Sequence, residues 1–362
     1  MLKLKHFANW LLLTVVTAGL VVGCGFSMEN RLGDDSALES TAQSTSNCRI
    51  VDHDLGETEI CGYPKKVVAL SSHALDLLLS LDRQPAGYAA PLDVYQGENF
   101  DDPAQQIPYL GDRITTQPVN LGKSGEPSLE KMVALKPDLI LAQRANSYNL
   151  LAQIAPTLIW QDRVLQDQWQ QHLRSLAIAL GEDQKAEDVL QQYEARIAEA
   201  RVEFADVVAA HPQLLLLAAH RLDEGVGIIG ADTYLEELLS GVGFQLIPPP
   251  AANANALISI EALPELDDAD TIVILGYNSD VSDRQLENSD SSADNSMEDL
   301  LETYQVKMIK QDWEASGIAQ SLTASQENRV YFATFYKWNA LNGEIGAELI
   351  LEELRQFLLA TL

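Results

Sequence analysis

Side chains suited to holding an anionic or planar group recur directly after the apolar, strand-like runs of this 362-residue sequence. Arginine presents forked donors to carboxylate or catecholate oxygens, while tyrosine and tryptophan cover an apolar rim. Because ligand groups gather beyond the carboxyl ends of strands in α/β proteins, these positions predict a single binding cleft. The predicted cleft residues are Ser72, His73, Arg144, Tyr148, Arg221, Tyr336 and Trp338.

Two arginines carry most of this prediction. Arg144 follows the apolar run 138–142 and Arg221 follows the run 214–219, which lie in opposite halves of the chain. Both are therefore expected to face one ligand, and an aromatic wall with arginines suits a metal chelate. The alternative for each residue is ordinary: a single arginine also serves as a surface ion pair, and a single aromatic side chain also serves in the core.

The histidines suggest a different ligand chemistry. His73 follows the first predicted strand and His220 stands at the equivalent place in the second half, so either is a candidate metal or haem ligand. No third ligand accompanies them, and zinc requires a fuller set of ligands. Loop histidines without a metal are the favoured interpretation, and the sequence predicts no metal site.

Motif-like stretches do not complete the catalytic chemistry that they suggest. Residues 225–230 match the spacing of a dinucleotide-binding loop, but no acidic residue ends a plausible next strand. Gly122-Lys-Ser124 resembles the end of a phosphate-binding loop, yet Gln117 stands where the leading glycine belongs. No nucleophile elbow and no zinc-protease motif occur. We therefore expect no enzyme and no cofactor.

The first residues predict export. Lys3 and Lys5 precede an apolar stretch at 10–22 that is short for a membrane span. The residues before Cys24 resemble the lipobox of bacterial lipoproteins, in which the cysteine becomes the lipidated first residue. This predicts a signal peptide at 1–23, lipidation of Cys24 and a polar tether at 24–46. The alternative is an ordinary signal or an uncleaved anchor.

Charge excludes one class of partner. The chain has 24 basic and 53 acidic residues, a net charge of −29, and losing Lys3 and Lys5 with the leader makes it about −31. Such a field repels phosphate backbones, so nucleic acid is not an expected partner. An anionic ligand would need local cations to hold it.

The two remaining cysteines bound a predicted hairpin. Folding residues 48–61 about Asp54-Leu55, with Gly56 in the turn, places Cys48 directly across from Cys61. A disulfide at this position would stabilise the fold by roughly 3 kcal/mol. Two free thiols are the alternative.

The body of the chain is predicted to have an α/β fold. Short apolar runs alternate with helical periodicity from residue 67 onward, which indicates largely parallel sheets. An apolar stripe at spacings of four and three predicts a long helix from about 184 to 209. Residues 279–302 are acidic and rich in serine, which predicts a surface insertion.

The two halves share short patterns in the same order. Leu75–Ser80 is echoed by Leu235–Ser240, and Ser128-Leu-Glu130 is echoed by Ser259-Ile-Glu261. The shared order favours duplication over chance. Two similar lobes are therefore expected.

Residues 49–81 and 119–141, together with 154–157, the long helix and the Trp338 region, resemble the helix-hinged (class III) substrate-binding proteins of ABC importers. These serve the uptake of iron-siderophore, ferric citrate, haem and cobalamin. The resemblance implies two Rossmann-like lobes with mostly parallel sheets, at 47–182 and 211–362. One long helix at 183–210 joins them. It also implies a periplasmic or surface lipoprotein that captures a ferric chelate, or alternatively haem or cobalamin.

The same resemblance assigns a docking role to Glu130 and Glu261. In that family a carboxylate on each lobe enters an arginine pocket of the permease dimer. The structural alternative is that each glutamate only complements the positive end of a helix. We expect a monomer held at the membrane by the lipid on Cys24, with a lipoprotein adhesin or an enzyme on a reused frame as rivals.

Overall fold

The computed structural model describes residues 47–90, 102–161, 168–230, 232–249, 257–277, 298 and 301–359. The chain divides into units Met1–Thr45 and Ser46–Leu362. The predicted signal peptide, Cys24, the tether and most of the insertion 279–302 lie outside the described residues. Within the described part, no helix combines the length and the apolar character that a membrane crossing requires.

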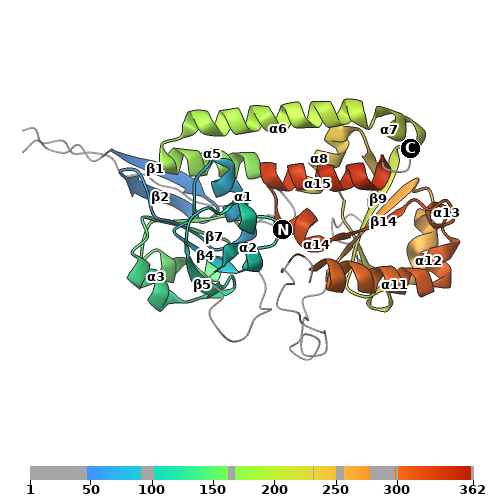
Figure 1. Cartoon of the computed structure of the whole chain (residues 1–362), viewed down its shortest axis with the longest axis horizontal. Coiled ribbons are helices and arrows are strands. Elements are labelled where there is room, and N and C mark those ends of the chain that lie inside the picture. Colours follow the sequence, from blue (N-terminus) through green and yellow to red (C-terminus); the bar gives the residue numbers. More distant parts are fainter. Residues whose placement is uncertain are drawn as a thin grey trace, which may run out of the picture. The chain divides into compact units, whose positions relative to one another are not determined.

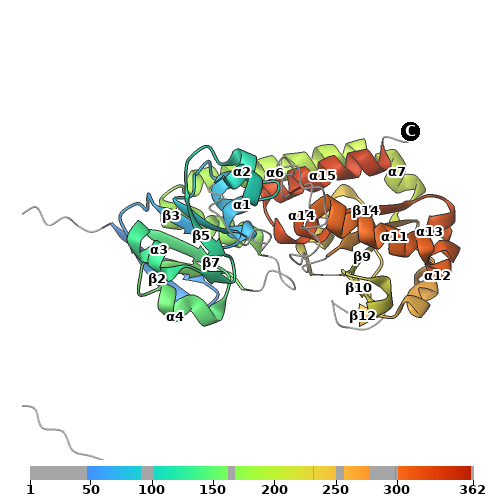
Figure 2. The same cartoon turned by 60° about the horizontal axis from the view of Figure 1, so that its bottom comes forward.

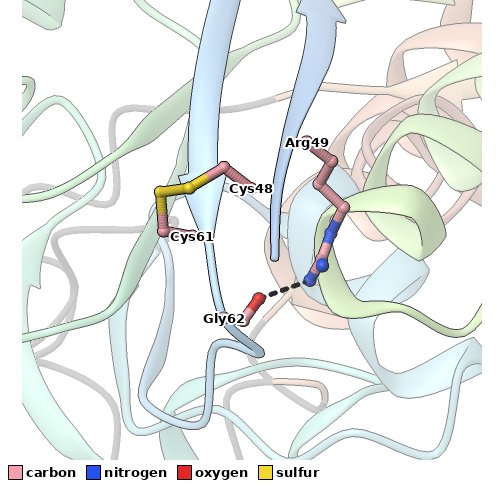
Figure 3. The surroundings of a disulfide bond; sticks show 4 residues. All are labelled: Cys48, Arg49, Cys61 and Gly62. Carbon is pink, nitrogen blue, oxygen red and sulfur yellow. Dashed lines mark hydrogen bonds between the residues drawn. A yellow bond between two sulfur atoms is a disulfide. The ribbon is translucent and has the colours of Figure 1, made fainter. Parts of the chain in front are cut away.

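A disulfide-bridged hairpin opens the second unit. Strands β1 (Cys48–His53) and β2 (Gly56–Cys61) pair in the predicted register, with Cys48 opposite Cys61 and a bond between their sulfurs. Gly56 has a φ of +125° at the turn, which favours glycine. Figure 3 shows Arg49 reaching the carbonyl of Gly62, and the same guanidinium donates to Ala179, which anchors the hairpin on the first lobe.

The first lobe is built on a six-stranded sheet of order β6-β5-β4-β3-β7-β8, parallel except for β6. Val67, Ala69 and Leu139 enter one apolar cluster, whereas Val68 and Ile140 enter another, because successive strand residues face opposite sides. Both sheet faces are therefore covered. The strands are β3 (Val67–Ala69), β4 (Gly87–Ala90), β5 (Val119–Lys123), β6 (Glu126–Pro127), β7 (Leu139–Ala142) and β8 (Thr157–Ile159).

Short helices surround this sheet. Ser71 caps α1 by accepting the amide N–H of Ala74, and Ser128 caps α3 by accepting that of Lys131. The helices are α1 (Ser72–Ser80), α2 (Pro103–Gln106), α3 (Leu129–Leu135), α4 (Tyr148–Leu151) and α5 (Trp169–Leu180).

The second lobe has its own sheet of order β12-β10-β9-β13-β14, with β11 paired to β9. The pairings β9–β13, β13–β14 and β9–β11 are parallel, and β10 and β12 are antiparallel. The dinucleotide-like stretch 225–230 thus contains an antiparallel strand. The strands are β9 (Gln213–Ala219), β10 (Val226–Ile228), β11 (Gln245–Leu246), β12 (Leu257–Ile258), β13 (Thr271–Gly276) and β14 (Val330–Thr334).

Helices cover the second sheet as well (Figure 2). Thr233 caps α8 as Ser71 caps α1 in the first lobe, in keeping with the sequence echo. The helices are α8 (Tyr234–Val242), α11 (Lys307–Ala315), α12 (Gly317–Ser321), α13 (Thr323–Gln326), α14 (Phe335–Ala340) and α15 (Glu344–Leu358), and the 3-10 helix η4 covers Ile260–Leu266.

A long helix connects the two sheets. Helix α6 (Asp183–Glu203) packs against α5, α8 and α15, and its 21 residues span about 30 Å (Figure 1). The prediction of one helix to residue 209 is wrong at its end, because α6 ends at Glu203 and a separate helix, α7 (Ala205–Ala210), follows Phe204. Phe204 is fully buried and packs against Phe244, and it lies at the break between α6 and α7.

Polar contacts also join the lobes directly. The buried Asp76 of α1 accepts the amide N–H groups of Ile345 and Gly346, at 3.2 and 2.9 Å, in the first turn of α15. Burial raises the pKa of Asp76 to about 7 despite these hydrogen bonds. Tyr109 and Thr334 share a further hydrogen bond of 3.0 Å between the lobes.

Candidate ligand-binding site

A pocket of about 700 Å³ opens at the carboxyl ends of strands in the first lobe. Strands β3, β7 and β8 and the turn between β5 and β6 contribute to it, which is where ligand groups gather in parallel sheets. The lining residues are Leu70, Ser124, Gly125, Pro127, Ala142, Gln143, Arg144, Ala145, Asn146, Ser147 and Gln161.

Arg144 is the charged side chain of this lining. It follows β7 in an extended conformation and leads into the 3-10 helix Ala145–Ser147, whose Ser147 hydroxyl donates to the Arg144 carbonyl at 2.8 Å. Its guanidinium lies against Gly125, where an added Cβ would sit 3.1 Å from Nη2. Arg144 is exposed, and no carboxylate among the described residues pairs with it. The guanidinium is therefore available to an anionic group.

Neutral polar groups complete the pocket. The Ser124 hydroxyl donates to the Leu70 carbonyl at 2.8 Å, which ties the β5–β6 turn to the end of β3. Gln143, Asn146 and Gln161 add side-chain amides that both donate and accept. These residues are absent from the predicted cleft, although Gln143 directly follows the apolar run 139–142, which is a signal visible in the sequence.

The structure does not bring Arg221 into this pocket. Its guanidinium pairs with Asp223 through two contacts of 3.0 and 3.1 Å, and the side chain is half exposed. The neighbouring His220 lies 2.9 Å from a carboxylate oxygen of Glu224. The cation of the second lobe that was expected to face Arg144 thus has a local partner.

The two aromatic residues predicted to form a wall of the cleft are buried. Trp338 is fully buried, and its indole N–H donates to Glu353 at 2.5 Å within the second lobe. Tyr336 is also buried; its hydroxyl shares a hydrogen bond of 2.6 Å with Ser72, and its ring stacks with Tyr109 at 6.1 Å. Ser72 and Tyr336 therefore meet each other across the lobes.

His73 points into the core and does not reach the pocket. It is 2% exposed, and its Nε2 lies 3.0 Å from Nδ1 of His172, beside the Trp160 ring. Burial lowers the pKa of His172 to about 4, so that imidazole is neutral at pH 7. Tyr148 is half-buried, with its ring 5.3 Å from that of His53 in the hairpin. Neither predicted residue lines the pocket.

The two glutamates expected at the permease lie in equivalent places. Glu130 is exposed in the first turn of α3, and Glu261 is exposed in the first turn of η4. Hydrogen bonds from its own backbone N–H and from the Ser259 hydroxyl lower the pKa of Glu261. This carboxylate is therefore ionised at neutral pH.

The described residues contain one group close enough together to suggest metal binding, formed by Cys48, Glu59 and Cys61. Its two sulfurs are joined in the disulfide, so they are not available as thiolate ligands.

Comparison with known proteins connects this architecture to solute capture. The family model described as "Periplasmic binding protein" matches residues 67–336. The Fe(3+)-citrate-binding protein YfmC of Bacillus subtilis is 24% identical over 333 residues, covering 91% of this chain and 90% of that protein. The putative ABC transporter substrate-binding lipoprotein YhfQ of the same organism is 26% identical over 323 residues, covering 84% and 87%.

A solved structure gives the same picture. Staphylococcus aureus SirA complexed with staphyloferrin B has a TM-score of 0.65 and 25% identity, covering 86% of this chain and 98% of that chain. FeuA of Bacillus subtilis complexed with ferri-bacillibactin has a TM-score of 0.62 at 20% identity, covering 86% and 98%, which is a likeness of fold. The arrangement of two lobes and a long helix is thus that of solved binding proteins.

Proposed function

The chain belongs to the periplasmic binding protein family, and we propose that it is the substrate-binding lipoprotein of an ABC importer that captures a ferric chelate. The observation that carries the proposal is the pocket of about 700 Å³ at the strand ends, with Arg144 available in its wall. A volume of this size suits a small molecule. Ferric citrate for YfmC and staphyloferrin B for SirA support an iron chelate as ligand.

In this proposal the first lobe holds the ligand by hydrogen bonds and one charge. The Arg144 guanidinium forms a forked pair with a chelate oxygen edge, while Ser124 and Asn146 bond to further oxygens. Iron is part of the cargo and is already coordinated by the chelator. The protein contributes recognition of the complex, and neither catalysis nor a cofactor is proposed.

In this proposal the two exposed glutamates serve delivery to the membrane importer. Glu130 and Glu261 each lie in the first turn of a helix, one in each lobe. Two charge-assisted contacts on separate lobes would let a permease dimer dock the protein and separate the lobes to release the ligand. The protein acts as a monomer, exported and held at the cell envelope by lipid on Cys24.

Haem or cobalamin, the alternative from the sequence, has less support. His73 is 2% exposed and adjoins His172, and His220 adjoins Glu224, so neither imidazole is presented to the pocket as an axial ligand.

Titration of the mature chain, without residues 1–23, tests this function. Ferric chelates should quench intrinsic tryptophan fluorescence saturably, the metal-free chelators should bind at least tenfold more weakly, and haem should leave its absorbance spectrum unchanged. Mass spectrometry of the protein purified from iron-starved cells should identify a co-purified chelator. Binding of haem with a shifted spectrum, and of no ferric chelate, would refute the proposal.

A further inference from the structure

The pocket is poor in charge. Among the described lining residues Arg144 is the single charged one, and none is a carboxylate. The remaining polar lining consists of hydroxyl and amide side chains, which bond to ligand oxygens without neutralising a net charge. The described wall therefore offers one positive charge.

The two described cations that follow strands of the second lobe lie in ion pairs. Arg221, after β9, is paired with Asp223 through both guanidinium contacts. Lys337, after β14, lies 2.9 Å from Glu353 and 3.4 Å from Glu302. Bringing either cation to a ligand would require breaking these ion pairs. These two described residues thus add little positive charge to that of Arg144.

The field of the whole chain adds a penalty for anions. Its 53 acidic residues exceed its 24 basic residues, and the net charge is −29. A potential of this sign lowers the local concentration of anionic ligands and slows their association. Each ligand charge beyond the one that Arg144 compensates is therefore disfavoured.

Ferric chelates differ sharply in charge. Three singly charged hydroxamates leave an uncharged ferric complex, whereas three doubly charged catecholates leave a complex with three negative charges. Resting on the function proposed above, we infer that the ligand is a ferric chelate of low net charge, of the trishydroxamate type. Arg144 bonds to one oxygen edge of such a complex, and the neutral hydroxyl and amide groups serve the rest.

The test compares two chelates on the mature chain. By tryptophan fluorescence, a hexadentate ferric trishydroxamate should bind at least tenfold more tightly than a hexadentate ferric triscatecholate. Raising the salt concentration should reduce this difference in affinity, because salt screens the repulsion between the acidic protein and the anionic complex.

A charge-adding variant makes the test independent of the choice of chelator. Asn146 is exposed and lines the pocket, so Asn146→Arg adds a second cation without disturbing the core. Relative to wild type, this variant should raise the ratio of triscatecholate affinity to trishydroxamate affinity at least tenfold, because the added cation compensates charge only on the anionic complex. Glu57→Gln, at an exposed site in the hairpin, changes the net charge equally and should leave both affinities within threefold.

The outcomes distinguish failure of the inference about ligand charge from failure of the proposed capture of a ferric chelate. Tighter binding of the triscatecholate or of ferric citrate by wild type would overturn the inference and leave ferric chelate capture standing. Saturable binding of no ferric chelate would overturn both.

Discussion

Asp76 is a buried carboxylate at the contact between the lobes, and it predicts a pH dependence of stability. Its folded pKa of about 7 lies above the ordinary value of 3.8, so the folded state binds a proton more tightly than the unfolded chain does. The stability that protonated Asp76 contributes to the fold is fully present below pH 3.8 and is lost as the pH rises through 7. Its size is at most about 4 kcal/mol.

Asp76→Asn should remove this dependence. The stability of wild type relative to the variant, measured by urea unfolding, should fall by a few kcal/mol between pH 4 and pH 7. The neighbouring Glu344 carboxylate is paired with Arg196 in both proteins, so it contributes little to the difference. A difference that stays constant over this range would contradict the assignment to Asp76.

Trp338 provides a test of core packing against ligand contact. Trp338→Phe loses the hydrogen bond to Glu353 and should destabilise the fold by about 1 to 3 kcal/mol, with the chelate dissociation constant unchanged within threefold. Trp169→Phe is the matched control, because Trp169 is equally buried and its Nε1 has no hydrogen-bond partner among the described residues. Weaker ligand binding by Trp338→Phe, without the same loss in Trp169→Phe, would show that Trp338 contacts the ligand as the sequence predicts.

At the scale of elements, the bridged hairpin predicts a measurable stability term. Cys48→Ser combined with Cys61→Ser should lower the free energy of unfolding by roughly 3 kcal/mol, since the bridge restricts the unfolded chain. Reduction of the wild type should match the double variant in urea unfolding. Equal stability of oxidised and reduced wild type would show that the strand pairing alone holds the hairpin.

Elements were predictable where local chemistry determines them. The turn at Asp54-Leu55 and Gly56 fixes the register of β1 and β2, and the fully apolar run at 139–142 forms a strand covered on both faces. The end of α6 was not predictable, because Phe204 fits the apolar stripe and leaves the helix only where it packs against Phe244.

Side-chain direction limited the prediction of the site. Of the residues that the strand-end rule predicts, Arg144 lines the pocket because it stands in an extended segment. His73 and Trp338 do not line it because α1 begins at Ser72 and α14 begins at Phe335. Helix packing, which depends on the other elements, then turns these side chains inward.

At the scale of the whole molecule, docking should be separable from capture. Glu130→Gln with Glu261→Gln should abolish chelate uptake by cells and leave the dissociation constant unchanged, because both carboxylates are exposed outside the pocket lining. Glu126→Gln with Glu265→Gln, which removes exposed neighbours in the sequence, is the matched control and should transport normally. Normal uptake by the first pair would refute the docking role.

We propose that Arg144, which pairs with no carboxylate among the described residues, holds the chelate at the strand ends of the first lobe. The most direct measurement is the dissociation constant of the best-bound ferric chelate for Arg144→Ala beside Arg174→Ala, whose arginine is half exposed and paired with Glu187 away from this pocket. Arg144→Ala should weaken binding by more than tenfold, and Arg174→Ala should change it less than threefold. Equal affinities for both variants would contradict this role of Arg144.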